Sequence, residues 1–174
     1  MITQENIERI KKAVHQPLNW EDYNSTSVIE DTNCFSHAIG STATAIRTAY
    51  RIGMLSGNKK EDEKYISIQE VKKLFLADLS VLQLENEEIP FENLTSFLEY
   101  LPKIDLSDNQ YIVALFVKIY GNYNIMDFHF LRYDKEKGWS EKRWNCKARF
   151  LEHISREWPS NWNDRLVGIF KITR

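Results

Sequence analysis

Cys34 and His129 are residues whose types and surroundings could together support nucleophilic catalysis. A cysteine thiol is mostly protonated at neutral pH, and it becomes a nucleophile when a helix N-terminus and a neighbouring imidazole stabilise its thiolate. Asp31, Thr32 and Asn33 precede Cys34, and all three are residue types that favour the N-cap of a helix. The sequence therefore predicts that Cys34 lies in the first turn of a helix.

His129 lies in the apolar run MDFHFLRY (126–133), which predicts a strand. The turn-forming run KEKG (135–138) follows, and WSEKRW (139–144) then predicts a second strand. If the two strands form a hairpin, Glu141 returns to the neighbourhood of His129, where a carboxylate could orient the imidazole. This prediction depends on the register, because a shift of one residue would turn Glu141 to the other face.

The elements that must position these residues follow from the spacing of apolar side chains. Helical periodicity predicts helices over residues 3–15, 34–50, 67–76, 91–101 and 147–157. Alternating, β-branched and aromatic runs predict strands over residues 79–84, 111–120, 126–133, 139–144 and 166–172. Residues 17–33 predict a long loop, a kind of segment that often carries function. Helices followed by an antiparallel meander are typical of an α+β fold.

Composition and charge exclude several classes of protein. The chain has 174 residues, which predicts a single domain over 1–174, and its 43% hydrophobic content is that of a globular protein. The net charge is −2, with acidic and basic residues mixed along the chain, so no basic face is available for nucleic acid. No apolar stretch approaches the length of a membrane span, so we expect no membrane partner.

The N-terminal sequence and the contexts of the two cysteines indicate the expected cellular compartment. MITQENIERIKK has no basic segment followed by an apolar run, so no secretory signal is predicted and the expected location is cytoplasmic. Export by a dedicated machine and release during phage lysis remain open. Cys34 and Cys146 lie in dissimilar contexts, and a disulfide between them is not expected in a cytoplasmic chain. The sequence indicates no cofactor and no oligomeric state.

The run NCFSHAIG (33–40), followed by DFHFLRYDKEKGWSEK (127–142), resembles the papain-like cysteine peptidase and amidase superfamily, nearest to the NlpC-type bacterial endopeptidases. RIGMLSG (51–57) and GWSEK also resemble segments of a set of bacterial papain-like proteins, in which a histidine stands at the position of Glu141. The resemblance implies a papain-like α+β fold, with N-terminal helices and a catalytic cysteine at a helix start packed on an antiparallel sheet.

The same resemblance implies hydrolysis of an amide or peptide bond. His129 would take the proton of Cys34, the thiolate would attack the carbonyl carbon, and water would clear the acyl-enzyme. Glu141, twelve residues after His129, stands where the orienting residue of such enzymes stands. The substrate is then a peptide or another amide. Peptidoglycan is not specifically implied, because NCFS replaces the DCSG signature of the cell-wall enzymes.

Three further residues are candidates for the oxyanion site or for substrate contact. Tyr23 lies eleven residues before Cys34, close to where related enzymes often place a tyrosine near the oxyanion. Asn33 lies beside the backbone N–H of Cys34, which could itself hold the oxyanion. Trp139 flanks the second hairpin strand and could line a cleft.

Other functions use the same residues. Cys34 could be a buried small hydrophobe, His129 a core histidine and Glu141 a surface charge, on a papain-like scaffold that serves as a silent binding or immunity-type module. Alternatively, Cys34, His37, His129 and Cys146 could form a tetrahedral zinc site. Thiol reactivity separates the hydrolase from the silent module, and metal analysis separates it from the zinc protein.

Overall fold

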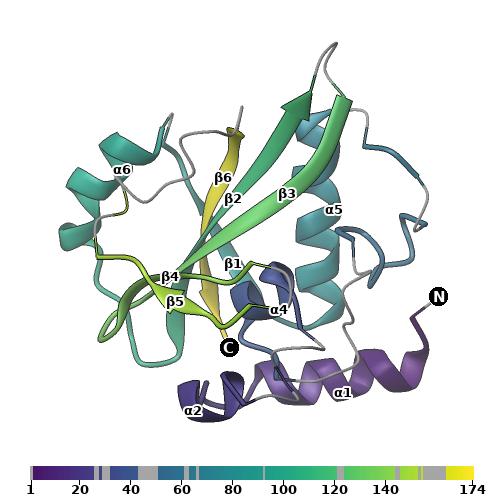
Figure 1. The fold of residues 1–174 in the computed structure, drawn as a ribbon, viewed down its shortest axis with the longest axis horizontal. Helices are drawn as coiled ribbons and strands as arrows, with labels where there is room; N and C mark the ends of the chain where they lie inside the picture. Colours follow the sequence, from purple (N-terminus) through teal and green to yellow (C-terminus); the bar gives the residue numbers. More distant parts are fainter. Residues whose placement is uncertain are drawn as a thin grey trace.

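A six-stranded antiparallel sheet forms the centre of the computed structural model (Figure 1). The structure describes the chain except for residues 1, 26–27, 29–31, 43–50, 61–62, 66, 92, 121–123, 144–145, 153 and 155–163. The strand order is β1-β6-β2-β3-β4-β5. The strands are β1 (Glu85–Ile89), β2 (Gln110–Tyr120), β3 (Asn124–Asp134), β4 (Gly138–Glu141), β5 (Arg149–Phe150) and β6 (Asp164–Thr173). The predicted α+β class and antiparallel meander are confirmed.

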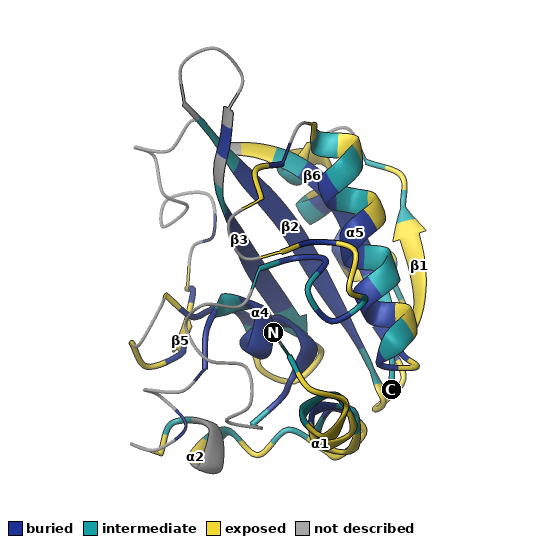
Figure 2. Ribbon diagram, turned by 90° about the vertical axis from the view of Figure 1, so that its right-hand side faces the viewer, coloured by how far each residue is buried: buried dark blue, intermediate teal, exposed yellow. Residues whose placement is uncertain are grey.

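Helices cover the two faces of the sheet. They are α1 (Gln4–Val14), α2 (Trp20–Tyr23), α4 (Cys34–Ile39), α5 (Ile68–Val81) and α6 (Leu94–Tyr100), which continues into a 3-10 turn (Leu101–Lys103). Helices α1, α4 and α5 bury apolar side chains in one hydrophobic cluster, and α6 packs in a second cluster. Figure 2 shows the buried strands β2 and β3 beside α5, whose outer side is exposed.

Strand β3 contributes side chains to both clusters because successive residues of a strand point to opposite faces. Phe128 and Phe130 belong to the first cluster, with α4 and α5, whereas Leu131 belongs to the second, with α6. The ring of Phe130 lies 5.7 Å from that of Phe35 in α4, measured between centroids. This contact packs the helix that begins at Cys34 directly against β3.

Several predicted elements differ from the structure, and among them the long loop predicted over 17–33 contains the short helix α2. The predicted helix over 34–50 ends at Ile39, because Gly40 adopts a left-handed conformation and its N–H bonds to the carbonyls of the last turn. Residues 43–50 lie outside the described part of the chain. The strand predicted over 79–84 is wrong, because α5 continues to Val81 and buries Leu79. The predicted helix over 147–157 is replaced at its start by β5, whose Arg149 pairs with Glu141. Residues 153 and 155–157 of this prediction lie outside the described part of the chain.

A buried carboxylate in α5 holds the segment that follows Ile52. Asp78 Oδ2 accepts the N–H of Gly53 at 2.6 Å, and Oδ1 accepts that of Ser56 at 2.8 Å. Asp78→Ala is expected to lower the free energy of unfolding by about 2–3 kcal/mol, because two N–H groups lose a charged acceptor away from water. Urea denaturation measures the loss. The exposed Asp108→Ala is the control, and an equal loss in both variants would contradict the prediction.

Candidate active site

Cys34 is the first residue of α4, as the sequence predicts. The side chain of Asn33 caps this helix, since its Oδ1 accepts the N–H groups of Phe35 at 3.0 Å and Ser36 at 3.1 Å. Ser36 Oγ in turn accepts the N–H of Asn33, which completes a capping box. The amide oxygen of Asn33 therefore holds the helix start, and the oxyanion role of this residue remains a prediction.

The sulfur of Cys34 lies against the backbone of β3. The side chain is half-buried, and its thiol donates a long hydrogen bond to the carbonyl oxygen of Phe128, with 3.9 Å between Sγ and O. Phe128 is the residue before His129 in β3. The fold therefore brings the thiol from a distant part of the sequence to within one residue of the predicted base.

The thiol is protonated in this arrangement. Burial raises the pKa of Cys34 to about 12, and the nearby carboxylate of Asp127 acts in the same direction. Three groups act against this shift: the N–H groups of Phe35 and Cys34, and the ammonium of Lys142. The groups that would stabilise a thiolate are thus present around the sulfur, but burial outweighs them.

His129 and Glu141 form a buried pair across the β3–β4 hairpin. His129 Nε2 and Glu141 Oε2 lie 2.9 Å apart, and the two residues are only 4% and 1% exposed. The register pairs Glu141 with Leu131, so Glu141 and His129 lie on the same face at diagonal positions. The predicted hairpin is confirmed, and its register directs the carboxylate to the imidazole.

Glu141 is ionised at neutral pH. Burial raises its pKa, but the hydrogen bond from His129, a hydrogen bond from Arg149 and the charge of Arg143 together lower the pKa to about 2. Arg149 Nη2 lies 2.6 Å and Arg143 Nε 3.1 Å from Glu141 Oε1. An ionised carboxylate can only accept, so Nε2 of His129 carries a hydrogen. In the neutral imidazole, Nδ1 is then the atom that can take a proton.

The hydrogen bonds of the described residues join the Cys34 thiol to the carbonyl of Phe128 and the His129 imidazole to Glu141, and none joins the thiol to the imidazole. His129 is opposite Phe116 of the second cluster, whereas Cys34 packs against the first. The thiol donates to the carbonyl of Phe128, not to the ring of the next residue. Proton transfer from the thiol to the ring therefore requires the sulfur to leave the carbonyl of Phe128. Strand β4 pairs with β3 over 131–134, and His129 lies just before this paired segment.

Tyr23 and Trp139 are the remaining candidate residues of the predicted site. Tyr23 is the last residue of α2, but its side chain lies outside the described part of the structure. Trp139 in β4 is 7% exposed and packs in the second cluster, with its ring 6.2 Å from Phe97 and 5.4 Å from Tyr133, measured between centroids. The structure thus gives Trp139 a packing role, and its place in a substrate cleft stays a prediction.

The four residues of the alternative zinc site are not gathered. His37 is buried, with Nε2 3.0 Å from Ser140 Oγ, whereas Cys146 is exposed. His129 is paired with Glu141 on the other face of the sheet. Within the described parts of the chain, no group of three or more histidine, cysteine or acidic side chains is arranged to hold a metal ion. The predicted zinc set is therefore not assembled.

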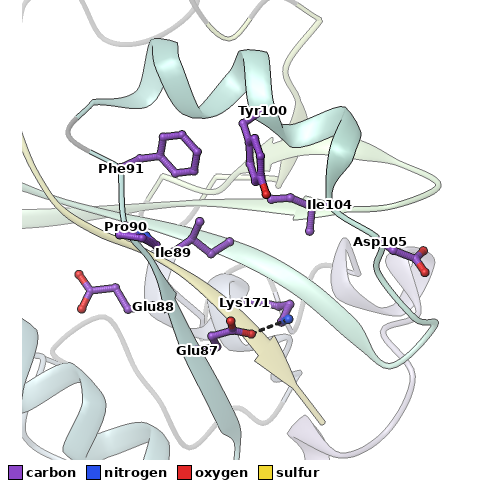
Figure 3. A pocket seen from close by; sticks show the side chains of 9 residues that line it. All are labelled: Glu87, Glu88, Ile89, Pro90, Phe91, Tyr100, Ile104, Asp105 and Lys171. Carbon is purple, nitrogen blue, oxygen red and sulfur yellow. Dashed lines mark ion pairs between the residues drawn. The ribbon is translucent and has the colours of Figure 1, made fainter.

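A pocket of about 390 Å³ lies at the opposite edge of the sheet, between β1 and α6. Figure 3 shows Phe91 and Tyr100 on its helical side and the ion pair of Glu87 with Lys171 on its strand side. Its lining residues are Glu87, Glu88, Ile89, Pro90, Phe91, Tyr100, Ile104, Asp105 and Lys171. None of the predicted catalytic residues lines this pocket.

No protein-family model, curated protein or solved structure matches the chain. The papain-like resemblance therefore rests on the residues quoted from the sequence. Among the helices that the structure describes, none has the length and apolar character needed to cross a membrane.

Proposed function

We propose that this protein is a papain-like cysteine hydrolase that cleaves a peptide or another amide through an acyl-enzyme on Cys34. The observation that carries the proposal is the buried pair of His129 and Glu141, one residue along β3 from the carbonyl that the Cys34 thiol contacts. A cysteine at a helix start, a histidine on a strand and a carboxylate on the next strand are the three parts that such chemistry requires.

The reaction begins when Nδ1 of His129 takes the proton of the Cys34 thiol. Glu141 holds the ring with its hydrogen on Nε2 and stabilises the imidazolium that forms. The thiolate then attacks the carbonyl carbon of the substrate, and the N–H of Cys34 is placed to hold the oxyanion. His129 returns the proton to the leaving amine, and water hydrolyses the thioester.

The substrate-free structure holds the thiol in its protonated form, so activation requires the sulfur to leave the carbonyl of Phe128. A sulfur that turns away from this carbonyl can approach the imidazole of the next residue and become hydrated. Hydration removes the burial that raises the pKa of Cys34 to about 12, while the N–H groups at the helix start remain in place. The proposal thus assigns thiol activation to the substrate-bound form.

p-Nitrophenyl acetate tests the proposal without knowledge of the natural substrate, because an activated thiol takes up its acetyl group. We expect a burst of p-nitrophenolate and a single acetyl group on Cys34, located by mass spectrometry of peptides. Cys34→Ser should lose the burst. His129→Ala should slow it by about 10²-fold or more, because a general base contributes on that scale.

Cys146→Ser is the matched control, since it removes the other cysteine, which is exposed, and should retain the burst. Acetylation that persists in Cys34→Ser, or that is unaffected in His129→Ala, would overturn the assignment of the site. Far-ultraviolet circular dichroism of each variant separates lost chemistry from lost folding.

The second candidate is a catalytically silent binding or immunity-type module on the same scaffold. The specific observation in its favour is the protonated thiol, which donates to a backbone carbonyl and not to the imidazole. This candidate predicts no burst with the wild-type protein and slow alkylation of Cys34 up to at least about pH 10, as for an inert buried thiol. The same acetylation experiment therefore decides between the two functions.

A further inference from the structure

We propose that Asp127 makes the surroundings of the Cys34 sulfur selective for a positively charged group. In the proposed hydrolase, the natural substrate then carries an ammonium or guanidinium group close to the bond that is cleaved. The inference about the substrate rests on the proposed function, whereas the charge preference of the thiol can be measured without it.

Two hydrogen bonds to one residue of β3 place the carboxylate next to the sulfur. Asp127 Oδ1 accepts the N–H of Phe128 at 2.8 Å. The Cys34 thiol donates to the carbonyl oxygen of the same residue, with 3.9 Å between Sγ and O. In an extended strand, the N–H and the C=O of one residue point to the same side of the strand. The carboxylate and the thiol therefore lie on the same side of β3, within one residue of each other.

The negative charge of Asp127 is only partly compensated within the protein. The side chain is half-buried, and the hydrogen bond that it accepts comes from a neutral backbone N–H. Within the described part of the chain, no ion pair includes Asp127. A half-buried carboxylate is stabilised by a cation that binds to it, so a positively charged ligand group suits this position.

The pKa of the Asp127 carboxyl agrees with this incomplete compensation. Burial raises this pKa above its ordinary value. The groups that act to lower it are the N–H of Phe128 and the side chains of His129, Lys118 and Arg51, but burial outweighs them. A further cation at the carboxylate would therefore favour its ionised form.

The carboxylate also acts on the nucleophile. After burial, Asp127 is the largest cause of the raised pKa of Cys34. A cation bound at the carboxylate would offset this effect, whereas an anion would be repelled. Binding of a cationic substrate would therefore help the thiol to ionise while the substrate carbonyl is within reach.

One side-chain cation acts on the thiol in the opposite direction. Lys142 lowers the pKa of Cys34, but its effect is smaller than that of Asp127. The other groups that lower this pKa are the backbone N–H groups of Phe35 and Cys34, which carry no net charge. The side-chain charge with the larger effect on the sulfur is therefore negative, which favours a positively charged ligand group.

Two thiol reagents of opposite charge test this preference. Both are methanethiosulfonates, which form a mixed disulfide with a thiolate and release methanesulfinate; one carries a trimethylammonium group and the other a sulfonate. Their rates with Cys34 are measured in a Cys146→Ser background, because Cys146 is exposed. We expect Asp127→Asn to lower the ratio of the cationic to the anionic rate by roughly fivefold at low salt, the scale of one charge at short range in a hydrated site.

The ratio isolates charge from other effects of the substitution. Asp127→Asn retains an oxygen that can accept the N–H of Phe128, so it removes the charge and keeps the hydrogen bond. A change in the exposure or the pKa of the thiol affects both reagents alike. Asp108→Asn, at an exposed position, is the matched control and should leave the ratio unchanged. An unchanged ratio in Asp127→Asn overturns the inference.

A salt series tests the same preference without a substitution at Asp127. Sodium chloride at about 1 M should lower the ratio of the two rates, because it screens the carboxylate from the reagents. A ratio that does not fall with salt would also overturn the inference.

Two activated esters test the substrate class. Glycine p-nitrophenyl ester carries an ammonium group, which N-acetylglycine p-nitrophenyl ester lacks. We expect Asp127→Asn to lower the ratio of their acylation rates at Cys34, and the comparison between variants cancels the intrinsic reactivity of the esters. An unchanged ratio rejects the cationic substrate. A protein that neither ester acylates, but whose methanethiosulfonate ratio falls in Asp127→Asn, upholds the charge preference and rejects only the hydrolase.

Discussion

Arg132→Met is expected to lower the free energy of unfolding by about 3–5 kcal/mol, because it leaves the carboxylate of Asp134 without its buried partner. Arg132 is fully buried, and its guanidinium binds Asp134 through two hydrogen bonds, with Nε to Oδ2 at 2.8 Å and Nη2 to Oδ1 at 2.7 Å. It also lies over the ring of Tyr111, 3.8 Å from the centroid. This pairing helps to lower the pKa of Asp134 despite its burial.

The same guanidinium fixes the helix that begins at Cys34. Arg132 Nη1 donates to the carbonyl of Ala38 at 3.3 Å, in the last turn of α4. A Cβ at Gly40, the residue that ends this helix, would lie only 2.7 Å from Nη1, so the glycine lets the guanidinium approach closely. Loss of Arg132 should therefore loosen α4 against β3 as well as destabilise the fold.

Urea denaturation at neutral pH measures the effect of Arg132→Met, and the exposed Arg9→Met is the control. Adding Asp134→Ala to Arg132→Met should recover part of the loss, since the uncompensated carboxylate is then removed. A loss below about 1 kcal/mol in the single variant would mean that the ion pair adds no more than a surface pair does.

The sequence predicts the parts of the site that depend on local patterns. Three capping residue types before Cys34 indicate the start of α4, and the spacing of two apolar runs around KEKG indicates the β3–β4 hairpin. A local signal also indicates the end of α4, because a glycine such as Gly40 commonly follows the last residue of a helix. The apolar residues that follow favour continuation of the helix to residue 50, and this interpretation is wrong, because α4 ends at Ile39.

Contacts between distant segments could not be predicted in the same way. No pattern in the sequence shows that Arg132 is fully buried, because an arginine in a strand usually faces water. The alternation of WSEK separates Glu141 from Lys142, but it does not say which face meets α4. Which atoms of β3 the Cys34 thiol contacts depends on the position of α4 along β3, to within less than one helical turn. In the structure, the thiol contacts the carbonyl oxygen of Phe128.

Removal of the Glu141 carboxylate, which binds His129, should also have a large effect on stability. Glu141→Gln is expected to lower the free energy of unfolding by about 3 kcal/mol at neutral pH, which is the free-energy equivalent of a pKa held at about 2 in place of 4.5. Glutamine has nearly the same shape, so the loss reports the charge that His129, Arg143 and Arg149 stabilise. Because the variant also removes the group that holds His129, it should slow acetylation of Cys34.

The stability that the Glu141 carboxylate contributes should depend on pH. The folded-state pKa of Glu141 is below its unfolded value, so its stabilisation is fully present above about pH 4.5 and is lost as the pH falls toward about 2. The difference between wild type and Glu141→Gln, measured by urea denaturation at pH 7, 4 and 2.5, should therefore shrink with each step. The exposed Glu136→Gln should show no such change. A difference that is constant over this range would mean that Glu141 contributes through packing, and the carboxylate would lose its place as the group that orients His129 by charge.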